Sequence, residues 1–230
     1  MARYGIVAVV VIFYVTVALH FDYTPDDTYI YLQYAKHVAS GEGFSFNNES
    51  PSYGVTGPLW VLIVAAGGVG GLDPYTVAKI LDLVFACLAV LVLYVLASTV
   101  LKDRLYALCT AWIFSLDAWF LRWSASGMET SAAVLLSLVA ILYVFRNEYL
   151  IASIVCGLLS LLRPEGILLF AVIQVDNFLN TTDITPARRV FFRSLFLYGL
   201  IVVPWIVFSV SSFGSFLPNT LGAKTFEEIT

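Results

Sequence analysis

Apolar segments recur along almost the whole chain and are separated by short polar stretches. A helix needs roughly 17–25 predominantly apolar residues to cross a bilayer. Segments near this length predict helices at Tyr4–Phe21, Tyr75–Leu101, Leu105–Leu121, Thr130–Phe145, Tyr149–Leu162, Gly166–Phe178 and Leu195–Phe213. The pattern therefore predicts an all-α fold, a polytopic helical membrane protein with about seven transmembrane helices.

A polar, aromatic-rich loop, Asp22–Trp60, follows the first apolar segment directly. Its sequence Thr24-Pro25-Asp26-Asp27 is typical of a helix start, with Thr24 as the capping residue and the proline at the first helical position. We expect this helix to reach about Ser40. Its several tyrosines suit a helix that lies in the membrane interface.

The next apolar run, Gly57–Leu72, is short for a span and ends in a glycine-rich sequence. If it only dips into the membrane, seven Lys and Arg residues fall on the side of the N-terminus and five on the other; if it crosses, the counts reverse. Basic residues favour the cytoplasmic side of short loops. We therefore predict a dipping helix, a cytoplasmic N-terminus, residues 22–74 as the first outer loop, and a single domain over 1–230.

The composition places the chain outside the soluble globular class, because 60% of the residues are hydrophobic and only 12% are charged. The net charge is −4 and the 12 Lys and Arg residues are scattered, so nothing predicts nucleic-acid binding. The cysteines, Cys87, Cys109 and Cys156, lie inside apolar segments without metal-ligand spacing, and we interpret them as core residues.

The predicted topology gathers the polar clusters of the chain on its outer face. Charged residues next to membrane-length segments are costly, which makes these clusters candidates for a functional site. They are Asp26-Asp27, Arg122 with Ser126-Gly-Met-Glu129-Thr, Arg163-Pro-Glu165, and Pro218-Asn219-Thr220 with Lys224.

Six short motifs, in this order, carry a resemblance to a known family. They are Asp-Asp-x-Tyr-Ile from Asp26, Tyr-Ala-x-x-x-x-x-Gly-x-Gly-Phe from Tyr34, Tyr-Gly-x-Thr-Gly-Pro-Leu-Trp from Tyr53, Gly-Met-Glu-Thr, Leu-Arg-Pro-Glu-Gly and Leu-Pro-Asn-Thr. Together they resemble the GT-C glycosyltransferases, and within them the mannosyltransferase-like and arabinofuranosyltransferase-like enzymes that use polyprenyl-phosphate sugars.

The resemblance implies a multi-span enzyme whose first outer loop bears the catalytic aspartate and lies partly along the membrane. It implies a polyprenyl- or dolichyl-phosphate sugar as donor and a glycan, lipid or protein as acceptor. Enzymes of this kind usually continue well past the position of Thr230. We therefore also expect the chain to be an N-terminal portion, completed by further spans or by a second chain.

The residues suggest the same chemistry. A polyprenyl phosphate is already a good leaving group, so transfer needs a base for the acceptor hydroxyl and a cation for the departing phosphate. Asp26 or Asp27 is the candidate base, and the two are not equivalent. Arg163 is the first candidate for the phosphate, because a guanidinium contacts phosphate oxygens through two nitrogens.

Further candidates for binding substrate are Lys36, His37 and Arg122. Glu129 and Glu165 are expected to orient the acceptor or the arginine. Glu129 with Asp27 also offers hard oxygen ligands for a divalent metal, Mg²⁺ or Mn²⁺, which the spacing leaves open.

Structural roles compete with these assignments. Asp27 fits the carboxylate of a capping box, Arg163 and Glu165 fit an ion pair that closes a proline turn, and His37 fits an interfacial side chain. Asp117, near the outer end of a span, suits either the site or a helix cap. Asn48-Glu-Ser50 is a glycosylation sequon on the predicted outer side.

The favoured function is an inverting membrane glycosyltransferase in the cell membrane, with a multi-pass fold and an active site on the extracytoplasmic face. Two alternatives remain. A polytopic transporter would line a path with charges at mid-depth, whereas here they collect at one face. A non-catalytic N-terminal half would need a second chain to complete its donor site.

Overall fold

The computed structural model describes residues 2–47, 51–181, 184–216 and 218. These residues form only helices, turns and loops, which confirms the predicted all-α fold for the part described. The helices are α1 (Ala2–Ala18), α2 (Asp26–Ala39), α3 (Pro58–Val69), α4 (Pro74–Leu101), α5 (Arg104–Ser115), α6 (Ala118–Ser124), α7 (Thr130–Phe145), α8 (Tyr149–Leu162), α9 (Gly166–Asn180) and α10 (Ile184–Phe213). The sequon Asn48-Glu-Ser50 and Asn219, Thr220 and Lys224 lie outside the described residues.

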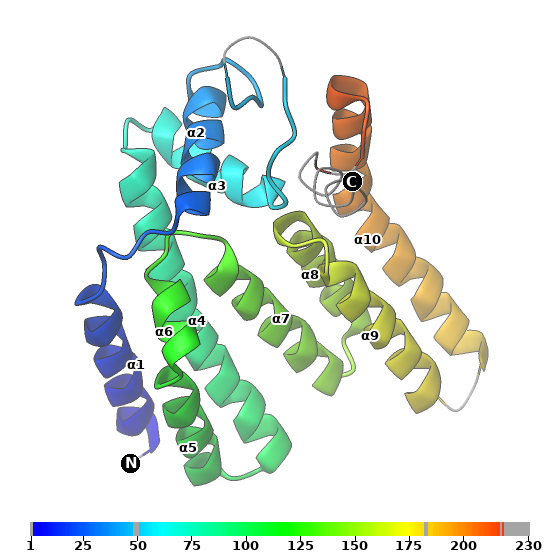
Figure 1. Cartoon of the computed structure of the whole chain (residues 1–230). Helices are drawn as coiled ribbons and strands as arrows, with labels where there is room; N and C mark the ends of the chain where they lie inside the picture. The colour runs from blue at the N-terminus through cyan, green and yellow to red at the C-terminus, as the bar shows by residue number, and fades with distance from the viewer. Residues whose placement is uncertain (1, 48–50, 182–183, 217, 219–230) are drawn as a thin grey trace, which may run out of the picture.

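Figure 1 shows α4, α7, α8, α9 and α10 as neighbours in a bundle, with α1, α5 and α6 beside α4. Helices α2 and α3 lie together at one end of this bundle, where α3 contacts α4 and α8. The N-terminus and the α4–α5 turn lie at the opposite end. The described parts of residues 22–74, which are 22–47 and 51–74, therefore form a cap over one end of the bundle.

Two of the described helices, α4 and α10, are long and apolar enough to cross a bilayer. The other apolar helices are shorter: Tyr4–Ala18, Pro58–Val69, Thr130–Phe145, Tyr149–Leu162 and Gly166–Asn180. Length and composition thus support membrane association through α4 and α10. They do not by themselves assign about seven spans.

The predicted cap of α2 is wrong. Helix α2 begins at Asp26, and no side chain caps it. The Thr24 hydroxyl lies 3.4 Å from the carbonyl oxygen of Asp22 and 3.1 Å from the hydroxyl of Tyr75, so it is engaged elsewhere. Without the capping threonine there is no capping box for Asp27 to complete, and its carboxylate is left exposed.

The segment Leu105–Leu121, predicted as one helix, is two helices. Helix α5 ends at Ser115, and α6 begins at Ala118. Asp117 causes the break, because its Oδ1 accepts a hydrogen bond of 2.7 Å from the backbone N–H of Phe120 and so caps a new helix. Of the two roles left open for Asp117, the structure supports the cap.

The loop between α2 and α3 is fixed by side chains from both ends of the chain. The Tyr34 hydroxyl lies 2.8 Å from Oγ of Ser52 and accepts a bond of 2.9 Å from the N–H of Gly54. Trp205 of α10 donates through Nε1 to the Tyr53 hydroxyl at 3.0 Å. These contacts hold residues 53–56 in place beside α2.

Candidate functional site

A cavity of about 320 Å³ lies where the cap meets the bundle. Four separate parts of the chain form its wall: α2, the loop before α3, the turn before α7 and the residue after α8. The lining residues are Asp27, Ile30, Tyr31, Gly54, Val55, Thr56, Met128, Glu129 and Arg163. We refer to this cavity as the polar pocket.

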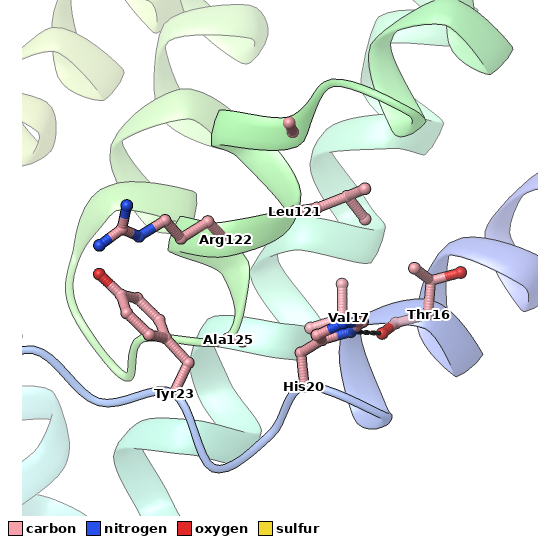
Figure 2. Close-up of a pocket in the computed structure, with 8 residues that line it drawn as sticks. Thr16, Val17, His20, Tyr23, Leu121, Arg122 and Ala125 are labelled. Carbon is pink, nitrogen blue, oxygen red and sulfur yellow. Dashed lines mark hydrogen bonds between the residues drawn. The ribbon is translucent and has the colours of Figure 1, made fainter.

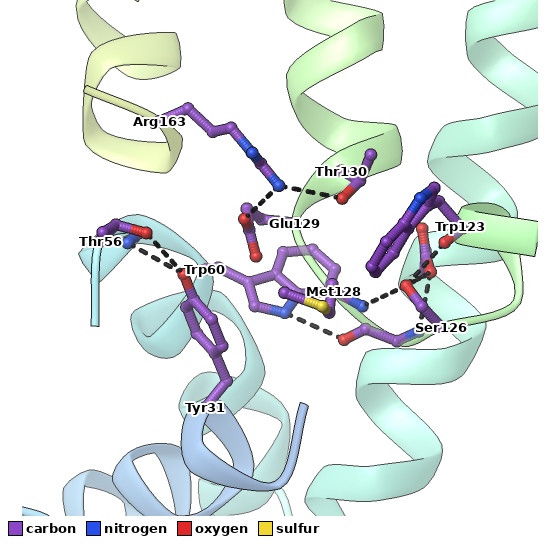
Figure 3. Close-up of polar contacts among 12 residues, drawn as sticks. Tyr31, Thr56, Trp60, Trp123, Ser126, Met128, Glu129, Thr130 and Arg163 are labelled. Carbon is purple, nitrogen blue, oxygen red and sulfur yellow. Dashed lines mark hydrogen bonds and ion pairs between the residues drawn. The ribbon is translucent and has the colours of Figure 1, made fainter. Parts of the chain in front are cut away.

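An ion pair joins two of the bundle segments in the polar pocket. Nη2 of Arg163 lies 2.9 Å from Oε1 of Glu129 and donates a second bond of 3.2 Å to Oγ1 of Thr130 (Figure 3). The Glu129 side chain is 2% exposed, whereas that of Arg163 is 39% exposed. The arginine therefore anchors one nitrogen on the buried carboxylate and keeps part of its guanidinium accessible.

Burial governs the ionisation of Glu129. Removal from water raises the pKa of this carboxyl, and the nearby Arg163 guanidinium opposes that shift. The net effect is a pKa above the ordinary value. Glu129 is thus a carboxyl whose charge depends on its arginine partner, as expected for a residue that responds to changes in the pocket.

Tyr31 of α2 closes the same pocket from the cap side. Its hydroxyl lies 3.2 Å from Oγ1 of Thr56 and accepts a bond of 3.2 Å from the N–H of Gly57 (Figure 3). Burial, followed by the negative charge of Glu129, raises the pKa of the phenol. The hydroxyl therefore stays protonated and is a neutral hydrogen-bonding group in the pocket.

The start of α3 is packed against the bundle by Gly57 and Trp60. A Cβ atom on Gly57 would lie 2.6 Å from the carbonyl oxygen of Leu162, so only glycine allows this approach. Trp60 is fully buried and donates through Nε1 to the carbonyl oxygen of Gly127 at 3.2 Å. These contacts tie the cap to the segments that carry Glu129 and Arg163.

Two buried charges of α4 support the turn before Glu129. Lys79 donates through Nζ to the carbonyl oxygens of Phe21, Tyr23 and Ala125. Asp82 accepts a bond of 2.8 Å from the N–H of Gly127 and one of 3.2 Å from Oγ of Ser126. The turn includes Gly127 at φ 79°, a conformation that favours glycine.

Sequence reasoning did not select Tyr31, Trp60, Lys79 or Asp82 as site residues. Lys79 and Asp82 could have been recognised as candidates, because two ionisable residues three positions apart within an apolar segment are unusual. No feature of the sequence distinguishes Tyr31 and Trp60, since many aromatic residues in membrane proteins have purely structural roles.

Three of the residues predicted from the sequence meet in the polar pocket: Asp27, Glu129 and Arg163. Asp27 has an exposed carboxylate, as has Asp26, but Asp26 is not among the lining residues. The structure therefore separates the two aspartates and places only Asp27 on the cavity.

The remaining predicted residues lie elsewhere. Lys36 is exposed on α2. His37 is buried, with Nδ1 2.9 Å from the carbonyl oxygen of Ser45 and Nε2 2.9 Å from Nε2 of Gln33, so it fixes the loop after α2. Arg122 lines a different cavity.

The alternative interpretation of Arg163 and Glu165 as an ion pair is wrong. Glu165 is exposed at the start of α9, and Arg163 pairs with Glu129 instead. The reason is the backbone at Arg163, which is extended at φ −143° and lies between two helices. The arginine side chain reaches the start of α7, which the sequence places 33 residues away from it.

The two carboxylates of the polar pocket make an incomplete set of metal ligands. No group of three or more His, Cys, Asp or Glu side chains gathers anywhere in the described part of the chain. Glu129 is already engaged by Arg163, which a cation would have to displace. The residues present therefore do not form a built site for Mg²⁺ or Mn²⁺.

Comparison of the chain with protein-family models, with curated proteins and with solved structures finds no match.

Proposed function

We propose that the chain is a membrane glycosyltransferase of the GT-C type, which transfers a sugar from a polyprenyl-phosphate donor to an acceptor hydroxyl with inversion. One observation carries this proposal. A carboxylate, Asp27, and a partly accessible guanidinium, Arg163, line one cavity although the sequence separates them widely. These are the two groups that such a transfer requires.

Asp27 is the proposed base. In the reaction, the acceptor oxygen attacks the anomeric carbon from the face opposite the phosphate, and a new carbon–oxygen bond forms. The bond between that carbon and the phosphate oxygen breaks, and its electron pair leaves with the polyprenyl phosphate. The proton of the acceptor hydroxyl moves to the carboxylate, which is exposed and free of a capping role.

Arg163 is the proposed partner of the donor phosphate. The arginine is already neutralised by Glu129, so it does not need the phosphate to offset a buried charge. The pair instead orients the guanidinium, because Nη2 bonds to Glu129 and Thr130 while part of the side chain stays accessible. A phosphate that arrives there gains charge-assisted hydrogen bonds from an arginine held in position.

The membrane setting of the proposal is a multi-pass chain whose shorter apolar helices cross together with α4 and α10. In this arrangement the N-terminus is cytoplasmic and the cap formed by residues 22–74 lies on the extracytoplasmic face. Helix α3 lies beside α2 at the cap end, which fits a dipping rather than a crossing segment (Figure 1). A lipid-linked donor then reaches the polar pocket from the bilayer.

The test is transfer from a panel of radiolabelled polyprenyl-phosphate sugars by the purified, reconstituted chain. Asp27→Asn should lower turnover by roughly 10²–10⁴-fold, the usual contribution of a general base, while donor binding persists. Asp26→Asn is the matched control and should retain most of the activity, because Asp26 does not line the pocket.

Two results would contradict the proposal. Equal and mild losses of turnover in Asp27→Asn and Asp26→Asn would mean that Asp27 is not the general base. If the wild-type chain neither bound nor transferred any sugar of the panel, polyprenyl-phosphate sugars would not be its donors.

A further inference from the structure

A second cavity, of about 400 Å³, lies between α1 and α6. It shares no lining residue with the polar pocket. Its lining residues are Thr16, Val17, His20, Tyr23, Ala118, Leu121, Arg122 and Ala125. The volume falls within the roughly 300–1,000 Å³ that ligand pockets occupy. We refer to it as the α1–α6 pocket.

Most of the wall of the α1–α6 pocket is apolar. Val17 and Ala125 are fully buried behind it, and Ala118 and Leu121 of α6 complete the apolar side (Figure 2). The polar side is formed by Arg122, with His20 at the end of α1. A cavity of this kind suits a ligand with an apolar body and a charged end.

The charge required of that end is negative. The guanidinium of Arg122 lies over the ring of Tyr23, with Cζ 4.7 Å from the ring centroid (Figure 2). It also lies 5.6 Å from the centroid of the Trp119 ring. Within the described ranges it forms no ion pair, since Asp117 is used as a helix cap and Asp22 does not pair with it. The two rings hold the cation in position, and its charge, at an exposed residue, has no counter-ion among the described residues and is open to a ligand.

The surroundings indicate a membrane lipid. The pocket lies beside α1, an apolar helix that exposes Val11 and Val15, and Leu19 in the turn after it is exposed as well. The described chain also has two helices long and apolar enough to cross a bilayer. Lipids at such a surface carry a phosphate where the apolar chains begin, and arginine matches phosphate geometry. A free phosphate would leave the apolar wall of the cavity unused.

We infer that the α1–α6 pocket binds a phospholipid, with its phosphate on Arg122 and one acyl chain against Val17 and Leu121. His20 lies beside the same headgroup. Its Nδ1 is 2.8 Å from the carbonyl oxygen of Thr16, which holds the ring in place. This site is independent of the proposed transfer reaction, because it uses none of the residues of the polar pocket.

The experiment compares three probes on the purified chain in detergent micelles: dioleoyl phosphatidic acid, dioleoylglycerol and inorganic phosphate. Binding is followed by native mass spectrometry and by the shift in melting temperature. Phosphatidic acid should bind saturably and raise the melting temperature. Dioleoylglycerol lacks only the phosphate, and inorganic phosphate lacks the entire diacylglycerol part, so each should bind at least about tenfold more weakly.

Variants locate the site. Arg122→Gln should weaken binding of phosphatidic acid about ten- to a hundredfold, the range for lost hydrogen bonds to a charged group. Ala118→Leu should weaken it by filling the cavity from its exposed rim, without changing any charge. Arg146→Gln is the matched control, because Arg146 also lies over a tyrosine ring, that of Tyr143, but at the far end of α7.

Three outcomes would overturn the inference. Equal weakening by Arg122→Gln and Arg146→Gln would show a general effect of surface charge. If dioleoylglycerol or inorganic phosphate bound as tightly as phosphatidic acid, the pocket would not recognise both the phosphate and the acyl chain of the lipid. Binding that is lost in Arg163→Ala but kept in both Arg122→Gln and Ala118→Leu would place the lipid in the polar pocket.

Discussion

Arg163 contacts its neighbours through a single nitrogen. Nη2 bonds to Glu129 and Thr130, whereas the buried Nε makes no hydrogen bond with the described residues. A ligand cannot reach the buried Nε, but 39% of the side chain is exposed and open to one. The exposed part of the side chain is therefore the place where a phosphate binds in the proposal.

Arg163→Lys should weaken donor binding, because an ammonium replaces a two-nitrogen contact with a point charge and also loses the fixed orientation on Glu129. We expect roughly a tenfold loss of affinity, and a larger one in Arg163→Ala. The measurement is binding of polyprenyl-phosphate sugars to purified variants that melt at the wild-type temperature. Unchanged affinity in both variants would leave Arg163 as a structural partner of Glu129 only.

Glu129→Gln should change how stability depends on pH. Burial raises the pKa of Glu129 above its ordinary value of 4.5, so the folded chain binds this proton more tightly than the unfolded chain. Relative to the variant, the wild type should be most stable below pH 4.5 and should lose that advantage as pH rises through the raised pKa.

Unfolding curves of the wild type and Glu129→Gln in detergent, recorded side by side over a pH series, measure this difference. The comparison cancels the titrating groups that do not interact with Glu129. A difference that grows in favour of the wild type with rising pH would mean that Arg163 outweighs burial and that the pKa is lowered.

At the scale of elements, the polar pocket depends on how closely α3 approaches α8. The N-terminus of α3 at Gly57 meets the last carbonyl groups of α8, and Tyr31 of α2 lies 3.2 Å from the same position. The hydrogen bond from Trp60 to Gly127 extends the contact to the turn before α7. Three helices thus share one junction directly beside the pocket.

Gly57→Ala should separate these elements. Its Cβ would lie 2.6 Å from a backbone oxygen, which cannot rotate away, so we expect a loss of about 1–3 kcal/mol in stability and weaker donor binding. Gly199→Ala in α10 is the control, because its nearest neighbour would be Val203 at 3.9 Å. Thermal unfolding and donor titration of both variants test this, and equal behaviour of the two would disprove the close approach.

At the scale of the molecule, the cap and the α4–α5 turn lie at opposite ends of the bundle (Figure 1). The exposed Glu165, between α8 and α9, is at the same end as the cap. If the chain spans the membrane as proposed, one end faces the cytoplasm and the other faces outward. The predicted orientation, which was based on the count of basic residues, can therefore be tested with one residue at each end of the bundle.

A cysteine at Glu165 should react with a membrane-impermeant thiol reagent in intact cells, and a cysteine at Arg104 should not. Both residues are exposed, so accessibility within the fold does not separate them. The background should lack Cys87, Cys109 and Cys156, of which Cys109 is exposed. Reaction at Arg104 with protection at Glu165 would reverse the proposed orientation.

The local sequence pattern predicted most helices of the bundle, but α10 begins at Ile184 and not at the predicted Leu195. Thr130–Phe145 and Tyr149–Leu162 have the bounds predicted from their apolar runs, and α4 begins one residue before the predicted start, at a proline that follows the capping Asp73. Such features depend on neighbours within one turn of helix, so a local pattern contains them. The break at Asp117 was also local, but a polar residue inside an apolar run fits several roles.

Which charged residues lie close to one another depends on the three-dimensional fold. It paired Arg163 with Glu129 rather than with Glu165, placed Asp27 and not Asp26 on the cavity, and assigned Arg122 to a separate pocket. Each of these outcomes depends on the distance between segments that are far apart in the sequence. Side-chain reach across a helix junction is a matter of a few ångströms, and no periodicity along the chain records it.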